Sequence, residues 1–315
     1  MLPLDIVAPD AVALIALFRD NGSASFGTAS VEVSRANYER SCAANGIQDP
    51  PVETIDHAVA VEGGSIRVRQ YLPAPAGAAE PAVIMVHGGG WVLGSLETHD
   101  LLARRLATRA GRSLFAVEYR LAPEHRFPVP LTDCLAALEF IRDNAEQLGV
   151  DPRQLTMVGD SAGGAMAAAL ANNPALATRG TRIVAQVLIH PVTDLGAESD
   201  SYTRIDEGFP LTGDSMRWFR DLYLARPEDA LDARASPARL RDPVSEPPRA
   251  FILTVGLDPL SDEGIAYAGY LARNGAQVEH HHLPHHTHGI FTSAGKVDTG
   301  RRYIDRVAAF IKEST

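Results

Sequence analysis

From about residue 50 onward, short β-branched apolar runs alternate with longer segments of helical periodicity. This alternation is typical of repeated βαβ units, in which helices cover both faces of a mainly parallel sheet. The first two runs flank Gly63-Gly64 and predict an antiparallel hairpin. The predicted strands are 57–62, 65–72, 82–86, 113–119, 154–158, 183–189, 250–255 and 276–282. The pattern therefore predicts an α/β fold with a doubly wound sheet of about eight strands.

Helical patterns fill the intervals, at 96–110, 130–148, 162–172, 262–274 and 297–311. Two stretches do not fit the alternation, residues 1–50 and residues 195–245, and the second contains a helical piece at 213–224. A long connection inside a compact domain is uncommon unless it has a function. We expect the two stretches to pack together as a helical cap over the strand ends. The α/β core would then consist of 51–194 and 246–315.

Composition and charge exclude several classes of function. Hydrophobic residues make up 45% of the 315 residues and charged residues 22%, which argues against a disordered or fibrous chain. The net charge of −10 lacks the basic footprint of a nucleic-acid-binding protein. The apolar run at 11–18 is too short to span a bilayer, and no basic residue precedes it as in a signal peptide. We expect a cytoplasmic protein with no nucleic-acid or membrane partner, in which Cys42 and Cys134 are free thiols.

The strongest chemical signal is Gly159-Asp160-Ser161-Ala162-Gly163, which lies between a predicted strand and a predicted helix. Gly-x-Ser-x-Gly in this context is the nucleophile elbow, in which the serine occupies a strained strand-to-helix turn. The small residues that follow let the helix approach the sheet and direct the positive end of its dipole toward the serine. Ser161 is therefore the candidate nucleophile.

A glycine-rich segment, His87-Gly88-Gly89-Gly90-Trp91, directly follows the strand predicted at 82–86. Without side chains, glycines leave their backbone N–H groups unobstructed, and such donors can stabilise an oxyanion. Three glycines alone also fit a flexible turn, but the elbow downstream favours the catalytic interpretation. We expect the amides of Gly88, Gly89 and Ala162 to form the oxyanion hole.

Taken together, five segments resemble the hormone-sensitive-lipase-like family of α/β-hydrolase carboxylesterases. These segments are 87–91, 119–124, 159–164, 258–264 and 288–289. The resemblance implies an α/β-hydrolase fold with a helical cap, no cofactor, and hydrolysis of short- to medium-chain acyl esters. It also suggests a homodimer in which the last strand and the helix that begins at Val297 pair across a two-fold axis, although a monomer is equally consistent with these residues.

The acid of a catalytic triad follows the nucleophile in this fold, and the histidine comes last. Asp258 lies three residues beyond Val255, past the end of a predicted strand, and matches the acid position of the family. Asp194 is a competitor because it also follows a strand. Asp262 and Glu263 are further competitors, although they suit the first turn of a helix. We expect Asp258 to orient the base.

The base must be chosen among six histidines within nine positions, at 280, 281, 282, 285, 286 and 288. Such density suggests a metal site. Successive side chains of a strand point to opposite faces, however, so the histidines at 280–282 cannot converge on one ion. His288 precedes Gly289, as in the His-Gly pair of the family, and is the expected base. His286 is the alternative, and no metal site is expected.

Trp91 and Trp218 could line a substrate pocket, although core packing accounts equally well for either. The expected function is a cofactor-free serine carboxylesterase that acts on a small-molecule ester through an acyl-enzyme. A non-catalytic small-molecule receptor on the same fold is one alternative, since a fold does not determine function. Such receptors typically lack a triad member, and here Ser161, Asp258 and His288 are all present. An amidase or a lactonase is the other alternative.

Overall fold

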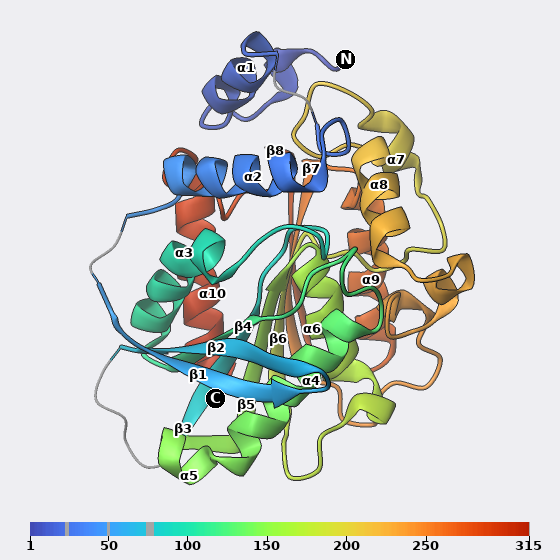
Figure 1. Cartoon of the computed structure of the whole chain (residues 1–315). Helices are drawn as coiled ribbons and strands as arrows, with labels where there is room; N and C mark the ends of the chain where they lie inside the picture. Colours follow the sequence, from blue (N-terminus) through green and yellow to red (C-terminus); the bar gives the residue numbers. More distant parts are fainter. Residues whose placement is uncertain (23–24, 49–50, 74–78, 315) are drawn as a thin grey trace.

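The computed structural model of the chain describes residues 1–22, 25–48, 51–73 and 79–314. One eight-stranded sheet lies at its centre (Figure 1). In chain order its strands are β1 (Glu53–Val61), β2 (Gly64–Leu72), β3 (Glu80–Val86), β4 (Ser113–Glu118), β5 (Val150–Asp160), β6 (Ile183–Ile189), β7 (Arg249–Leu257) and β8 (Val278–Thr287). Their spatial order is β1-β2-β4-β3-β5-β6-β7-β8.

The β1–β2 hairpin and the β2–β4 pair are antiparallel, and all other neighbours are parallel. All eight predicted strands are present, so the predicted mainly parallel α/β fold is confirmed. The largest difference is in β8, which continues to Thr287 instead of ending at residue 282. β8 is an edge strand with several exposed positions, which polar histidines can occupy. It therefore lacks the continuous apolar run that predicts a buried strand.

Helices cover both faces of the sheet, as the alternation predicts (Figure 1). The buried faces of α3 (Leu96–Ala110) and α10 (Asp298–Ser314) pack on one side of the sheet. On the other side lie α4 (Val129–Asp143), α6 (Ala162–Asn172) and α9 (Ser261–Arg273). The single helix predicted at 130–148 is divided by Asn144, after which the short α5 (Ala145–Leu148) begins.

The two stretches that depart from the alternation pack against each other beyond one end of the sheet (Figure 1). Their helices are α1 (Val12–Asp20), α2 (Val31–Asn45), α7 (Asp200–Arg204) and α8 (Gly213–Tyr223). The same stretches contain three short 3-10 helices, η1 (Leu4–Ile6), η3 (Pro227–Leu231) and η4 (Pro237–Arg239), whereas η2 (Pro174–Leu176) lies between α6 and β6. Ser25 Oγ donates to Phe209 O at 2.7 Å, and Ser215 Oγ donates to Phe26 O at 2.9 Å. We refer to residues 1–48 and 195–245 together as the cap.

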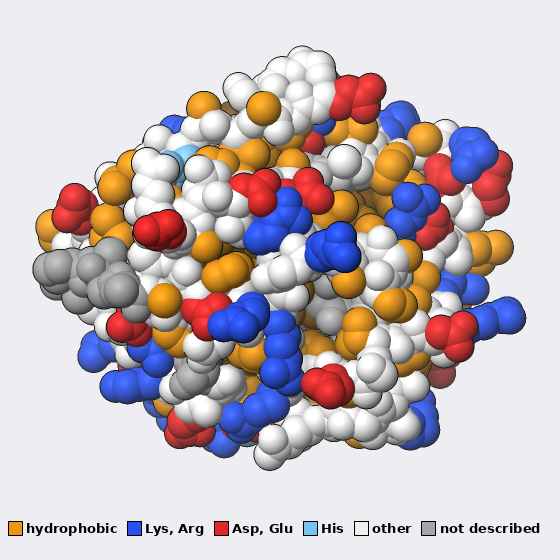
Figure 2. Space-filling model, turned by 90° about the horizontal axis from the view of Figure 1, so that it is seen from below, with side chains coloured by type: hydrophobic (Ala, Val, Ile, Leu, Met, Phe, Trp, Pro, Cys, Tyr) orange, Lys and Arg blue, Asp and Glu red, His pale blue; other side chains and the backbone are white. Residues whose placement is uncertain are grey.

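On the face farthest from α1, basic and acidic side chains alternate with scattered hydrophobic ones (Figure 2). Among the described residues, no helix has both the length and the apolar character that a membrane span requires. The cytoplasmic location stays a prediction. Cys42 and Cys134 are buried free thiols, as expected.

Candidate active site

Ser161 alone turns the chain from β5 into α6, since β5 ends at Asp160 and α6 begins at Ala162. Its φ of 55° and ψ of −120° lie in a region that residues other than glycine rarely adopt. Two backbone hydrogen bonds hold this conformation, from Ser161 N to Ile189 O at 2.9 Å and from Val192 N to Ser161 O at 3.1 Å. The local geometry is therefore that of the predicted nucleophile elbow.

Both glycines of the elbow motif are required by close packing. A Cβ atom on Gly159 would lie 2.3 Å from Gly163 O, and one on Gly163 would lie 2.1 Å from Val86 O. Both distances are far shorter than van der Waals contact. Glycine at these positions therefore lets α6 approach β3 and β5, which brings the amino end of the helix to Ser161.

Asp258 and His288 meet beside the elbow. Each is the first residue after its strand, Asp258 after β7 and His288 after β8. His288 Nδ1 lies 2.8 Å from Asp258 Oδ2, and Asp258 is fully buried. The second carboxylate oxygen, Oδ1, accepts the amide of Leu260 at 2.9 Å. Ser161 and His288 line one cavity of about 680 Å³. The structure thus brings the three predicted residues to one place.

The competing acids have other partners. Asp194 Oδ1 accepts from Arg239 at 2.6 Å, and Asp262 Oδ2 accepts the amide of Ser201 at 2.9 Å. Glu263 accepts two backbone amides just before the mid-chain cap segment. Burial raises the pKa of Glu263 to about 8, so its carboxyl group is mostly protonated at neutral pH. None of these three acids contacts His288.

The clustered histidines that precede His288 do not all meet at one point. His280 Nε2 and His282 Nδ1 each lie 2.9 Å from the Thr254 hydroxyl, on one face of β8. His281 points to the other face and lies 2.8 Å from a glutamate of its own strand. His286 Nε2 lies 3.1 Å from an aspartate near the N-terminus, so the alternative base has another partner.

One predicted oxyanion donor is wrong. The amide of Gly88 donates to Asp160 Oδ1 at 2.9 Å and is therefore not available to a substrate. Asp160 also pairs with His99 Nε2 at 3.2 Å. Burial by itself raises the pKa of Asp160, but the charge and hydrogen bond of His99 outweigh it, and the net shift is downward. Sequence reasoning missed both partners: Asp160 stood inside the motif, whereas nothing in the α3 pattern marked His99.

The next glycine offers an unpaired amide in place of that of Gly88. Gly89 and Gly90 both line the cavity of Ser161, at φ values of 119° and 61° that favour glycine. Within the described part of the chain, the amides of Gly89, Gly90 and Ala162 have no hydrogen-bond acceptor. Gly89, Gly90 and Ala162 therefore carry the unpaired amides near Ser161, in place of the predicted set of Gly88, Gly89 and Ala162.

His190 is a neighbour of this site that sequence reasoning missed. It directly follows β6, is 2% exposed and has a φ of 36°. Its ring centroid lies 4.0 Å from that of His288. Among the described residues, neither ring nitrogen of His190 has a hydrogen-bond partner. Burial lowers its pKa to about 3, so the ring is neutral at physiological pH. Its position at a strand end was a signal that could have found it.

Neither predicted pocket tryptophan lines the cavity of Ser161. Trp91 is fully buried and stacks on Tyr223, with ring centroids 4.1 Å apart. Trp218 packs beside Gly27 and against the ring of Phe219. Apolar side chains of the cap form much of the wall instead, namely Leu14, Ile15, Leu17, Phe18, Phe26, Leu211, Met216 and Phe219.

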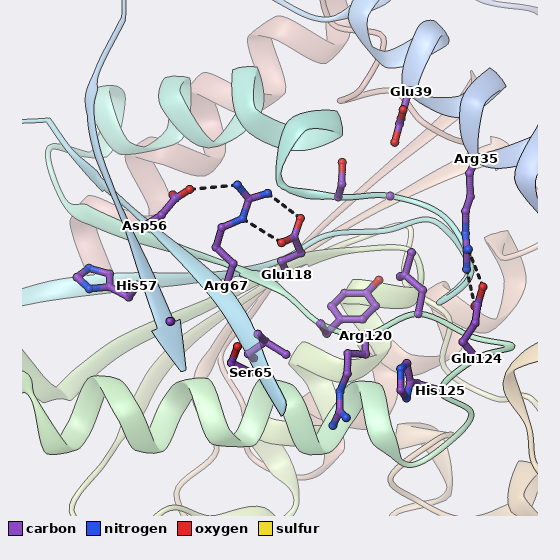
Figure 3. A pocket seen from close by; sticks show the side chains of 16 residues that line it. Arg35, Glu39, Asp56, His57, Ser65, Arg67, Glu118, Arg120, Glu124 and His125 are labelled. Atoms are coloured by element: carbon purple, nitrogen blue, oxygen red, sulfur yellow. Dashed lines mark hydrogen bonds and ion pairs between the residues drawn. The ribbon is translucent and has the colours of Figure 1, made fainter. Parts of the chain in front are cut away.

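A second cavity, of about 830 Å³, lies between the β1–β2 hairpin and the loops after β3 and β4 (Figure 3). Its charged side chains are largely paired with one another. Arg67 bridges Asp56 and Glu118, and Arg35 makes a two-pronged contact with Glu124 (Figure 3). None of the three predicted triad residues lines this cavity. It is a framework of ion pairs, separate from the cavity of Ser161.

Known proteins are similar to this chain in sequence and in fold. Residues 83–292 match the family with the α/β-hydrolase fold. The ethyl acetate hydrolase of Pseudomonas putida is 39% identical over 263 residues, which cover 82% of this chain and 81% of that protein. The carboxylesterase NlhH of Mycobacterium tuberculosis is 33% identical over 319 residues, which cover 98% of each chain. This chain belongs to the hormone-sensitive-lipase-like carboxylesterases of the α/β-hydrolase fold.

Solved structures agree with this assignment. An α/β-hydrolase enzyme from the metagenome of Lake Arreo, Spain, superposes on this carboxylesterase with a TM-score of 0.91 at 36% identity, covering 98% of each chain. An esterase of Pyrobaculum calidifontis superposes with a TM-score of 0.87 at 35% identity, again covering 98% of each chain. The predicted family and the predicted class of enzyme are thus confirmed, and the alternative of a non-catalytic receptor has no support among these relatives.

Proposed function

We propose that this carboxylesterase hydrolyses short- to medium-chain acyl esters with Ser161 as nucleophile, His288 as general base and Asp258 as the acid that orients it. One observation carries the proposal. A fully buried carboxylate lies 2.8 Å from Nδ1 of a histidine that shares its cavity with a strained serine. These are the relationships that a serine-hydrolase triad requires.

The first half-reaction follows from that contact. Because Asp258 accepts the Nδ1 proton of His288, the neutral imidazole keeps its lone pair on Nε2. Nε2 accepts the proton of Ser161 as Oγ attacks the ester carbonyl carbon, and Asp258 stabilises the imidazolium that forms. When the tetrahedral intermediate breaks down, His288 returns this proton to the leaving alkoxide. An alcohol departs, and the acyl group stays bound to Ser161.

The second half-reaction repeats these steps with water. His288 removes a proton from a water molecule, which attacks the acyl carbon, and then protonates Ser161 Oγ as the carboxylic acid leaves. In both halves the negative charge on the carbonyl oxygen needs donors that are in position before the reaction. The unpaired amides of Gly89, Gly90 and Ala162 are the candidates for that role.

The size and lining of the cavity support the proposed range of substrates. About 680 Å³ lies within the range of small-molecule sites, roughly 300–1,000 Å³. Its apolar wall suits an acyl chain, since burying a methylene group contributes about 0.8 kcal/mol. The relative named ethyl acetate hydrolase also favours a short acyl group. We propose that the cap, which supplies most of this wall, sets the accepted length.

Hydrolysis of chromogenic esters with acyl chains from two to sixteen carbons tests the range and the nucleophile together. We expect the wild type to prefer short and medium chains and to lose turnover on the longest ones. Ser161→Ala should show no turnover above the background rate. A flat profile up to sixteen carbons, or a faster reaction with anilides or lactones of the same acyl groups, would contradict the proposed substrate class.

Two matched variants test the acid. Asp258→Asn should lower kcat by roughly 10⁴-fold, because the asparagine side chain favours the wrong imidazole tautomer. Asp194→Asn is the control, since Asp194 also follows a strand of the core but pairs with Arg239 instead of a histidine. It should keep near wild-type kcat. Loss of activity in Asp194→Asn together with retention in Asp258→Asn would overturn the assignment.

A further inference from the structure

Among the described residues, His190, Asp258 and His288 are the one group of three potential metal ligands that the fold brings together. One donor atom of each lies within 4.8 Å of the other two. Donors around a tetrahedral zinc ion, with metal–ligand bonds of about 2.0–2.2 Å, are about 3.4 Å apart. Small rotations of these side chains would therefore close the group around an ion.

The donors are chemically suited to a transition metal. Two imidazoles and one carboxylate form a common ligand set of zinc sites that keep a fourth position open. Asp258 supplies a negative charge within a fully buried position, where attraction to a cation is only weakly screened. His288 borders the cavity, so an ion has a path from solvent and a place for a bound water molecule.

His190 is the independent observation that points to a ligand. It is 2% exposed, its ring packs against His288, and neither ring nitrogen has a partner in the part of the chain that the structure describes. Buried polar atoms of folded proteins are rarely left unpaired. An imidazole ring in its neutral form has one nitrogen lone pair that can coordinate a cation.

We propose that His190, Asp258 and His288 form an inhibitory site for a divalent transition-metal ion, with Zn²⁺ as the reference ion. The ion binds Nδ1 of His288, where the hydrogen-bonded proton now lies, together with the Asp258 carboxylate and one nitrogen of His190. The single proton of the neutral His288 ring then resides on Nε2. No proton is lost, yet Nε2 can no longer accept the proton of Ser161.

The inhibitory effect rests on the proposed function, because it assumes that Nε2 of His288 is the general base. Binding of the ion does not rest on it. The two can therefore be measured separately: inhibition from ester hydrolysis, and binding from the visible absorption of Co²⁺, whose intensity reports tetrahedral coordination. If Ser161→Ala were still active, the proposed function would fail, whereas Co²⁺ binding to that variant would still test the metal site.

The experiment uses chelator-treated protein and compares three replacements of histidine. His190→Phe keeps a ring against His288 and removes both nitrogens, and His190→Asn tolerates a positive φ better than phenylalanine does. His281→Phe is the control, since His281 belongs to the histidine-rich strand and already packs between Phe251 and Tyr303. Rates are expressed relative to each variant without added metal.

We expect Zn²⁺ to inhibit the wild type and His281→Phe alike, and a chelator to restore their activity. Both His190 variants should require roughly 100-fold more Zn²⁺, since even residues that only support a metal ligand change affinity by about 10- to 100-fold. They should also lose the Co²⁺ absorption. Equal inhibition of the His190 variants would overturn the proposal, as would the absence of Co²⁺ binding to the wild type.

Discussion

The core and the cap contribute to the same cavity in different ways. Each of the six parallel strands ends immediately before a residue of the site or its support: His87, Tyr119, Ser161, His190, Asp258 and His288. The cap instead reaches the cavity with long side chains from α1, α2 and α8. The main chain of the sheet thus fixes the reacting groups, while side-chain packing fixes the wall.

This difference has consequences for tolerance to substitution. The ladder of backbone hydrogen bonds fixes the position of a residue at a strand end, so a substitution at that residue affects the reacting atoms directly. Cap residues hold their place by packing, and changes of volume in such contacts are partly absorbed by repacking. Large losses of kcat are therefore expected from the core loops, and smaller or substrate-dependent effects from the cap.

Gly90→Ala tests where the core and the cap meet and should have the largest effect among the substitutions at that junction. An added Cβ would lie 2.2 Å from the ring of Phe219 in α8, and Gly90 has a φ of 61°. Either the loop or the ring must move, and we expect a shift of the loop that displaces the unpaired amide of Gly90 in the cavity of Ser161. Losing one oxyanion donor typically lowers kcat by roughly 10²- to 10³-fold. Steady-state kinetics with a short acyl ester should show that loss mainly in kcat.

Gly111→Ala is the matched control for backbone strain. Gly111 has a φ of 64°, close to that of Gly90, but no heavy atom lies within 4 Å of its added Cβ. Both variants should unfold at lower denaturant concentration than the wild type, and only Gly90→Ala should lose kcat. If Gly111→Ala lost as much kcat, general destabilisation would explain the result and the role of Gly90 as a donor would be contradicted.

The same difference explains which features the sequence could predict. Alternation of strands and helices predicts the sheet, and motifs at strand ends indicate side chains that the sheet brings together. Ser161 was accessible from this pattern, and the resemblance to the family then singled out Asp258 and His288 among their competitors. Their meeting needed no knowledge of the cap. The elbow was equally accessible, because its glycines are required by contacts within the sheet-and-helix unit itself.

Contacts between distant segments were not accessible. Gly88 was assigned as a donor because no pattern indicates that its amide binds Asp160, which in turn pairs with His99 of α3. Trp91 was assigned to the pocket because an aromatic residue beside a glycine loop fits either a wall or the core. Its stacking on Tyr223 depends on how α8 returns to the core, which periodicity does not specify.

Arg35→Met should have an intermediate effect, because Arg35 fastens α2 to the loops of the core. Its Nε donates to Val92 O at 2.9 Å, and Nη2 donates to Ala122 O at 3.0 Å. Nη2 also donates to Glu124 at 2.7 Å (Figure 3). Hydrogen bonds to charged groups contribute about 1.5–3 kcal/mol. We call the glycine-rich loop after β3, which contains Gly89 and Gly90, the oxyanion loop. A loss of about 1.4 kcal/mol of transition-state stabilisation through displacement of this loop would lower kcat tenfold, and we expect a decrease of roughly that size.

Two further variants separate the carbonyl contacts of Arg35 from its ion pair. Glu124→Gln should have a much smaller effect, since Glu124 is largely exposed and exposed ion pairs contribute little. Arg67→Met removes an arginine from the same charged cavity without touching the oxyanion loop, and should leave kcat near the wild-type value. An equal loss of kcat in Arg67→Met would mean that the whole charged cavity, and not the link from the cap, maintains the loop.

Glu263→Gln should have the smallest effect and should appear only as a change in the pH dependence of stability. Glu263 lies in the first turn of α9 and accepts the amides of Thr193 and Asp194, so it holds the point where the chain leaves the core for the mid-chain cap segment. Burial raises its pKa from 4.5 to about 8 in the folded protein. Between these values the folded state binds a proton that the unfolded state has lost, so the free energy of unfolding falls as the pH rises.

Glutamine stays neutral in both states and can still accept the same amides, so this source of pH dependence disappears in the variant. Urea unfolding at about pH 5, 7 and 9 should therefore show a difference, wild type minus variant, that is most favourable to the wild type at the lowest pH and declines through the window from 4.5 to about 8. A difference that does not change with pH would mean that the pKa of Glu263 is the same in the folded and the unfolded protein, so that Glu263 is ionised in the folded state at neutral pH. The junction of core and cap would then contain a buried charge, which the two amides alone would have to stabilise.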